Sequence, residues 1–201
     1  MIQRKAFAAA LPGLVAGILL VAAPGPVPAG EAPPLAGEFA DNFTLLNPPV
    51  PAPLEGFEDL DGRRVHLADF AGKVVLLNFW ATWCAPCVRE MPSLDRLQAK
   101  LRDDGLAVVA VSLDRGGAAV VRPFAARLNL TQIGLYLDAN NALSNAVGIT
   151  GLPTTFVIDA AGRIVGALQG PAEWESPAAL ALVRYYLSER QRSDKQSAAS
   201  D

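Results

Sequence analysis

Residues 73–87 read KVVLLNFWATWCAPC, an apolar run followed at once by two cysteines three positions apart. The nearly continuous apolar character of residues 73–80 is typical of a strand that is buried on both faces of a sheet. Residues 86–102 place apolar side chains at helical spacing, so we predict a helix there. Cys84 and Cys87 therefore lie where a buried strand ends and a helix begins.

This position gives the two thiols different chemistry. The first backbone N–H groups of a helix have no intrahelical partner, and the helix dipole places roughly half a positive charge there. A thiol at such a site has its pKa lowered from about 8.5 to roughly 3.5–7.5. Pro86 suits the first helical turn, where its missing N–H would be unpaired anyway. We expect Cys84, at the tip, to be the attacking thiolate and Cys87 to be the resolving thiol.

Strand and helix signals alternate outside this unit. They predict a hairpin at the turn 60–63, a strand over 106–113, a helix over 118–128, a strand over 133–137, a short helix over 142–147, a hairpin over 154–168 and a helix over 173–190. This order predicts an α/β fold, with a central mixed β-sheet flanked by helices and an N-terminal β-hairpin extension.

The composition excludes several classes of function. The 201 residues carry a formal net charge of −3, which gives no electrostatic footprint for nucleic acid. Two cysteines and one histidine cannot form a closed four-ligand zinc site of the usual Cys/His kind. We find no glycine-rich phosphate loop after a strand, so no nucleotide function is predicted. We expect no cofactor and no metal beyond a redox-active disulfide.

The first 29 residues are typical of a signal peptide or membrane anchor. Arg4 and Lys5 precede the uncharged, mostly apolar run 6–23, which as a helix would reach about 27 Å, close to the roughly 30 Å of bilayer hydrocarbon. An uncleaved run would tether the protein to the inner membrane with its remainder in the periplasm. The small residues around Ala29 also fit a signal-peptidase site, which would release a soluble periplasmic protein.

Three further regions follow from composition. Residues 30–53 are rich in proline and alanine and are predicted to be an extended tether outside the core. The compact domain is expected over residues 54–190. The polar segment 191–201 is predicted to be a disordered tail.

A family resemblance rests on three segments. Residues 79–87 (FWATWCAPC) resemble the active-site segment of thioredoxin-like proteins. Pro92 falls where those proteins kink the active-site helix, and residues 151–155 (GLPTT) precede a strand where they place a cis-proline. Four further segments resemble the TlpA family of membrane-anchored bacterial thiol:disulfide interchange proteins. They are residues 61–62, 67–73 (LADFAGK), 87–92 (CVREMP) and 170–174 (GPAEW).

The resemblance implies a client-binding surface around the cysteines. It implies that the Leu152–Pro153 bond is cis, that Pro153 faces the disulfide, and that the Leu152 backbone can pair with an extended partner chain. Trp83 would offer an apolar docking surface. The expected client contacts are Trp83, Ala85, Pro86, Leu152 and Thr154.

The resemblance also assigns a role to Glu90. Thioredoxin has a buried aspartate at the position of Asn78, and an amide cannot act as a base. Relatives close to TlpA have a glutamate at the position of Glu90, three residues after Cys87 and so on the same helix face. We expect Glu90 to relay a proton to or from Cys87. The alternative is a solvated first-turn acid that the helix dipole favours.

We therefore predict a periplasmic enzyme that reduces disulfides in exported client proteins. An oxidising compartment requires a membrane protein that recharges the reductant with electrons. The TlpA resemblance implies clients of respiratory oxidase copper-centre assembly or, in a related branch, apocytochromes c. The alternatives are a module that binds Cu(I) through Cys84 and Cys87, a thiol oxidase and, least favoured, a thiol peroxidase.

Two other residues and one short segment are further functional candidates. Nothing in the sequence brings His66, the single histidine, to the cysteines, so we expect a structural or surface role for it. Trp174 is expected to pack in the core. Residues 112–114 (SLD), at a strand end, are a weak candidate for the rim of the site.

Overall fold

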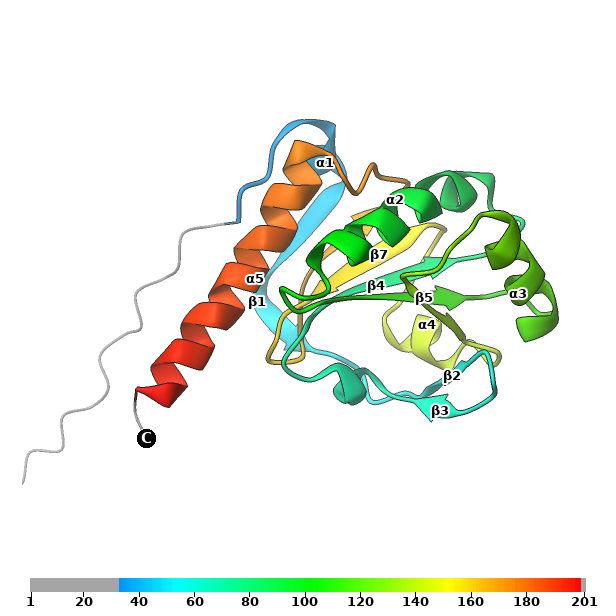
Figure 1. The fold of residues 1–201 in the computed structure, drawn as a ribbon, viewed down its shortest axis with the longest axis horizontal. Coiled ribbons are helices and arrows are strands. Elements are labelled where there is room, and N and C mark those ends of the chain that lie inside the picture. Colours follow the sequence, from blue (N-terminus) through cyan, green and yellow to red (C-terminus); the bar gives the residue numbers. More distant parts are fainter. Residues whose placement is uncertain (1–32, 200–201) are drawn as a thin grey trace, which may run out of the picture. The chain divides into compact units, whose positions relative to one another are not determined.

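A computed structural model describes residues 33–199 of the protein, and the predicted signal or anchor at residues 1–29 lies outside them. Within the described residues, helices flank a mixed sheet of eight strands (Figure 1). None of the helices in residues 33–199 combines the length and the apolar character needed to cross a bilayer.

In chain order the elements are α1 (Gly37–Asn42), β1 (Phe43–Pro51), β2 (Phe57–Asp59), β3 (Arg64–Val65), the 3₁₀ helix η1 (Leu67–Phe70), β4 (Val74–Trp80), α2 (Ala85–Leu101), β5 (Leu106–Ser112), α3 (Ala118–Arg127), β6 (Gly134–Leu137), α4 (Ala142–Ala146), β7 (Thr154–Ile158), β8 (Arg163–Gln169) and α5 (Pro177–Ala198). From β2 onward the elements follow one another in the order that the sequence predicts, and two unpredicted elements, α1 and β1, precede them.

The sheet order is β1-β8-β7-β4-β5-β6-β2-β3. β4, β5 and β6 run parallel, whereas β7 pairs antiparallel with both β4 and β8. Every residue of β4 and of β5 is buried, as expected for central strands that are covered on both faces. The predicted α/β architecture with a mixed sheet is confirmed.

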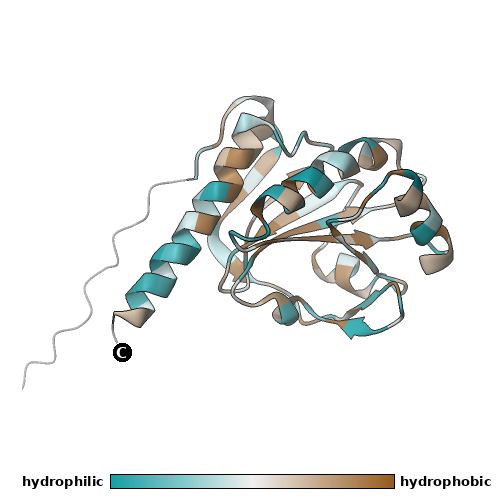
Figure 2. Ribbon diagram, in the orientation of Figure 1, coloured by the Kyte–Doolittle hydropathy of each residue, from teal (hydrophilic) through white to brown (hydrophobic). Residues whose placement is uncertain are grey.

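Two apolar clusters cover the two faces of the sheet. One joins side chains of α2, α3 and α5 to the even-numbered apolar positions of β4, such as Leu76 and Trp80. The other joins α4 and η1 to the odd-numbered positions, such as Leu77 and Phe79. Figure 2 shows this pattern as hydrophobic central strands and a hydrophilic C-terminal half of α5. The alternation of side chains along β4 therefore decides which residues face α2.

The prediction of a tether over residues 30–53 is wrong for residues 37–51, which form α1 and β1. β1 lies at the edge of the sheet and pairs antiparallel with β8, and its Phe43 is buried in the core. Three prolines lie in this strand because it has only one partner and because its register is interrupted between Leu45 and Val50. Proline, which has no N–H, is tolerated at such edges and irregularities.

The hairpin extension is confirmed. β2 pairs antiparallel with β3 across the turn at Gly62, and β2 also pairs with β6, so the hairpin continues the sheet beyond the parallel strands.

The C-terminal helix differs from the prediction at both ends. It begins at Pro177, because the Ser176 hydroxyl accepts a hydrogen bond from the Ala179 N–H and so caps it. It continues through most of the segment predicted to be a disordered tail. Residues 191–199 are exposed, as a polar segment should be, but good helix formers and the Arg192–Glu189 ion pair extend the helix over them.

Candidate active site

The two cysteines form a disulfide at the N-terminus of α2, with their Cα atoms 5.3 Å apart. Cys84 is the N-cap residue, and its Sγ accepts a hydrogen bond from the Cys87 N–H at 3.3 Å. The residue Cys84 is 7% exposed and Cys87 is fully buried. A backbone N–H of the first turn therefore already points at the Cys84 sulfur, which is the interaction that stabilises a thiolate there.

The residues beside Cys84 form an open surface. The Trp83 side chain is 70% exposed, which is unusual for so large an apolar group, and Ala85 is exposed. Pro86 is half-buried in the first turn of α2. All three predicted contact residues of this segment therefore have surface available to a partner chain.

The loop before Cys84 is held by Asp114, which follows β5. Asp114 Oδ2 accepts a hydrogen bond from the Thr82 N–H at 2.9 Å, and its Oδ1 accepts one from the Thr82 hydroxyl at 2.6 Å. The Ser112 hydroxyl donates to Asp114 Oδ2 at 2.7 Å. The sequence marked residues 112–114 only as a weak rim candidate, whereas in the structure they fix the backbone two residues before Cys84.

The predicted cis bond between Leu152 and Pro153 is present. Thr154, the first residue of β7, is the register partner of Phe79 in β4, so the turn at Pro153 lies beside the end of the strand that leads to Cys84. Leu152 is half-buried and Pro153 is buried. The Thr154 hydroxyl donates to the Gly151 carbonyl at 2.9 Å, so it stabilises the turn.

Glu90 lies inside the protein on α2, with 3% of its surface exposed. Its Oε1 accepts a hydrogen bond from Asn78 Nδ2 at 2.8 Å, and its Oε2 accepts one from the Ala172 N–H at 3.0 Å. Burial raises the pKa of Glu90 to about 7, and these two hydrogen bonds oppose that rise. The alternative of a solvated first-turn acid is wrong, because the helix face shared with Cys87 packs against the sheet.

Asn78 occupies the centre of β4 on the face toward α2, and it is fully buried. Its Nδ2 also donates to the Thr155 hydroxyl in β7, at 2.9 Å. The amide therefore joins Glu90 to the strand that follows Pro153. The sequence indicated only that Asn78 could not be a base. Its partner Thr155 follows from the register of β4 against β7, which places these two residues opposite each other.

The family follows from comparison with known proteins. A family model described as Redoxin matches residues 35–183, which is most of the chain. This chain belongs to the Redoxin family.

Individual relatives are described as redox proteins that act on thiols and disulfides. The chain is 36% identical over 112 residues to the thiol-disulfide oxidoreductase ResA of Bacillus thuringiensis subsp. konkukian, a match that covers 56% of this chain and 64% of the relative. It is 40% identical over 112 residues to ResA of Geobacillus thermodenitrificans, with 56% and 63% covered. The chain thus spans less than two thirds of the length of these relatives.

Several solved structures share the architecture of this domain. A thiol:disulfide interchange protein of the thioredoxin family from Chlorobium tepidum TLS has a TM-score of 0.59 and 30% identity, covering 69% of this chain and 97% of that one. StoA from Bacillus subtilis has a TM-score of 0.52 and 26% identity, covering 61% and 92%. The fold of this Redoxin-family chain is thioredoxin-like, as the resemblance of its active-site segment predicted.

One face of α2 in this Redoxin domain also holds the segment between β8 and α5. Besides the Ala172 bond to Glu90, the Trp174 N–H donates to the Ser93 hydroxyl at 3.2 Å, and Arg96 Nε donates to Glu175 Oε2 at 2.5 Å. Glu90, Ser93 and Arg96 are three residues apart, so they lie along one stripe of the helix. The sequence showed no sign of this attachment, since residues 173–176 were predicted to be helical.

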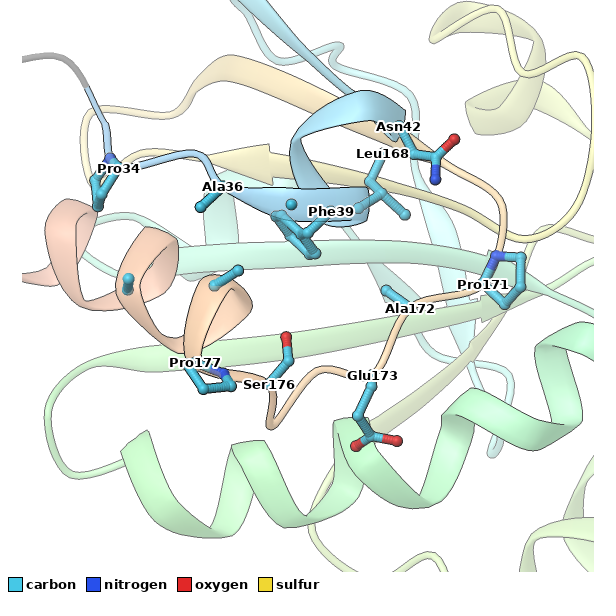
Figure 3. Close-up of a pocket in the computed structure, with 13 residues that line it drawn as sticks. Pro34, Ala36, Phe39, Asn42, Leu168, Pro171, Ala172, Glu173, Ser176 and Pro177 are labelled. Carbon is cyan, nitrogen blue, oxygen red and sulfur yellow. The ribbon is translucent and has the colours of Figure 1, made fainter.

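A cavity of about 640 Å³ lies on the other side of the same segment (Figure 3). Its lining is mostly apolar and comes from α1, residues 171–173 and the first turns of α5, with Phe39 and Leu168 among the side chains. Ala172 lines it while its N–H binds Glu90. Neither Glu90 nor a cysteine lines the cavity, and Ala172 is the residue that connects its wall to Glu90.

The two remaining candidates lie away from the cysteine chemistry. His66 caps η1, and its ring Nδ1 lies 3.1 Å from the Leu54 carbonyl oxygen, in agreement with a structural role. Trp174 is fully buried in the core, as expected. Among residues 33–199 no group of three or more His, Cys, Asp or Glu side chains is arranged to hold a metal ion.

Proposed function

We propose that this protein is a thiol:disulfide oxidoreductase that reduces disulfide bonds in client proteins. The observation that carries the proposal is the position of the Cys84–Cys87 disulfide. Cys84 caps α2, and the cis-Pro153 turn lies at the end of β4 that leads to Cys84. The names of the relatives and of the structural neighbours support the same chemistry. The cysteines themselves hold the two electrons.

The first step is attack on the client. In the reduced protein the Cys84 thiolate, which the N-terminus of α2 stabilises, attacks one sulfur of a client disulfide. A bond forms between Cys84 and that sulfur, and the other client sulfur leaves as a thiolate. Trp83, Ala85 and Pro86 provide the surface against which the client lies, and the Leu152 backbone pairs with its extended chain.

The second step releases the client. The Cys87 thiol loses its proton to Glu90, attacks the Cys84 sulfur, and expels the second client thiolate, so the client has gained two electrons and Cys84–Cys87 is oxidised. A pKa of about 7 suits Glu90 to this exchange, because the carboxyl group can both take up and return a proton near neutral pH.

The place of action is a separate part of the proposal. The apolar run at residues 6–23 behind Arg4 and Lys5 supports export with a membrane anchor, so the domain would work in the periplasm. A reductant in that oxidising compartment needs a membrane electron donor that reduces Cys84–Cys87 after each cycle. The proposed clients are exported proteins whose metal-binding or haem-attachment cysteines have become oxidised.

Trapping of the intermediate tests the reaction. In cells that express the Cys87→Ser variant, Cys84 should remain joined to its client, and mass spectrometry should identify a mixed disulfide that dithiothreitol releases. The matched Cys84→Ser variant, which keeps the buried thiol, should trap nothing. Equal trapping by both variants, or by neither, would contradict the assigned roles.

The redox potential tests the direction. A value near roughly −250 mV for the Cys84–Cys87 pair supports a reductase, whereas a value near roughly −120 mV indicates a thiol oxidase. Tight stoichiometric binding of Cu(I) by the reduced protein, without exchange activity, would favour the metal-binding alternative instead.

A further inference from the structure

The nitrogen of the Asn78 side-chain amide makes two hydrogen bonds, whereas its oxygen makes none within the described residues. Its Nδ2 donates both to Glu90 Oε1 at 2.8 Å and to the Thr155 hydroxyl oxygen at 2.9 Å. Its Oδ1 is buried and accepts no hydrogen bond within residues 33–199. Buried carbonyl oxygens nearly always have a partner, so this vacant acceptor next to a buried acid requires an explanation.

The observed arrangement suits an ionised Glu90. A carboxylate only accepts hydrogen bonds, and here it receives one from the Asn78 amide and one from the Ala172 N–H. The second amide hydrogen goes to Thr155, which accepts with its hydroxyl oxygen. Both hydrogens of Nδ2 are therefore used.

A neutral Glu90 has the opposite requirement. Its O–H becomes a donor and needs an acceptor, while Nδ2 of Asn78 offers only hydrogens at that place. Of the buried side-chain atoms without a partner in the described residues, Asn78 Oδ1 is the one oxygen. The oxygen and nitrogen of an amide are nearly equal in shape, so a half-turn exchanges them without repacking.

We propose that Asn78, together with Thr155, is the positioning residue that supplies Glu90 with partners in both of its charge states. When Glu90 takes up a proton, the amide turns by half a rotation. The two hydrogen bonds from Nδ2 break, and Oδ1 instead accepts one hydrogen bond from the Glu90 O–H and one from the Thr155 hydroxyl, which now acts as a donor. When Glu90 releases the proton, the amide returns to the arrangement observed here. No charge moves except that proton, which in the proposed reaction comes from Cys87.

Among the groups around Glu90, the Asn78 amide and the Thr155 hydroxyl are the ones that can change between donating and accepting a hydrogen bond. The Ala172 N–H is a fixed backbone donor, and the Trp174 indole lies near enough to lower the pKa of Glu90 without making a hydrogen bond of ordinary geometry. One turn back on α2, Cys87 titrates only when the disulfide is reduced. The exposed pairs of Arg96 with Glu173 and Glu175 lie two turns further along.

Nuclear magnetic resonance of the oxidised full-length protein tests the inference, with no client and no titrating thiol. The Glu90 carboxyl ¹³C signal gives its pKa, and the Asn78 side-chain amide signals are followed in the same samples. We expect the amide signals to shift with the same midpoint as Glu90, and the contact between the amide hydrogens and the Thr155 methyl to weaken below that midpoint. Amide signals that stay constant through the Glu90 titration would overturn the inference.

Substitution of Thr155 provides a second readout. Thr155→Val keeps the shape but removes the hydroxyl. When Glu90 is ionised, the variant takes away the acceptor of one Asn78 amide hydrogen. When Glu90 is neutral, the variant takes away one of the two donors to Oδ1, which keeps the Glu90 O–H as its partner. We expect the pKa of Glu90 to rise by roughly one unit, a tenfold change in proton affinity. The matched Thr155→Ser variant retains the hydroxyl and should keep the original pKa. Equal pKa values in the valine and serine variants would contradict the proposed pairing.

The inference deepens the proposed function, but the two can fail separately. Coupled titration of Glu90 and Asn78 in a protein without exchange activity would leave the inference standing and remove the proposed function. Exchange activity without coupled titration would do the reverse.

Discussion

Ionisation of Glu90 is unfavourable in the folded protein, because burial removes water from its carboxylate and only a few hydrogen bonds replace that water. The folded pKa of about 7 lies well above the ordinary value of 4.5, and burial is the largest cause. Between these two values the folded protein binds more protons than the unfolded chain. Stability should therefore fall as the pH rises from 4.5 through 7.

The Glu90→Gln variant tests this balance. The rise of the Glu90 pKa from 4.5 to about 7 corresponds to about 3 kcal/mol of unfolding free energy. This contribution is fully present below pH 4.5 and is lost as the pH rises through 7. Urea unfolding of the oxidised wild-type protein should show most of that decline between pH 4.5 and 8, and the glutamine variant should show a much flatter profile. Parallel profiles for the two proteins would mean that Glu90 does not titrate in this range.

Among the elements, α2 both carries the cysteine pair and holds the segment between β8 and α5 in place. Its first turn presents N–H groups to Cys84, while the stripe formed by Glu90, Ser93 and Arg96 holds the segment between β8 and α5. The same helix therefore fixes the position of the disulfide relative to the loop beside it. Pro92 lies within this helix, between the acid and Ser93.

The N-terminus of α2 predicts an acidic thiol. In the reduced protein, the helix dipole and the Cys87 N–H should bring the pKa of Cys84 below the ordinary value of about 8.5, into the range of roughly 3.5–7.5. Thiolate absorbance near 240 nm, followed against pH in the Cys87→Ser variant, isolates this group. A midpoint at or above the ordinary value would remove the attacking thiolate from the mechanism.

At the scale of the whole molecule, the domain is larger than the thioredoxin-like segment suggested by the sequence. β1 adds an eighth strand and places Phe43 against the core, next to Gly166 of β8, which has no side chain to occupy that space. The domain therefore begins before residue 43, in agreement with the Redoxin match from residue 35.

The edge strand can be tested with two positions of β1. Phe43 is 6% exposed and Leu45 is 40% exposed. Phe43→Ala should lower the unfolding free energy by about 3–5 kcal/mol, as expected for a buried aromatic side chain. Leu45→Ala, in the same strand, should cost less than about 1 kcal/mol. Similar small losses in denaturant unfolding would show that β1 is a peripheral tether after all.

Patterns along the chain predicted the central strands, α2, the cysteine pair and, through the family resemblance, the cis bond at Pro153. These features depend on neighbours in sequence: a run of buried apolar residues, helical spacing, and a proline before a strand. The partners of Asn78, the anchoring role of Asp114 and the strand at residues 43–51 were not predicted. Each of these depends on residues far apart in the chain.

Local sequence was thus sufficient to decide most of the elements after residue 54 and the identity of the reactive thiols, because backbone propensity and hydrophobic periodicity act over a few residues. Only the tertiary structure decided that Glu90 is buried, that β4 and β7 bring Asn78 opposite Thr155, and that a proline-rich segment completes the sheet. Desolvation and strand register are properties of the packed molecule, and they convert an ordinary glutamate into an acid that titrates near neutral pH.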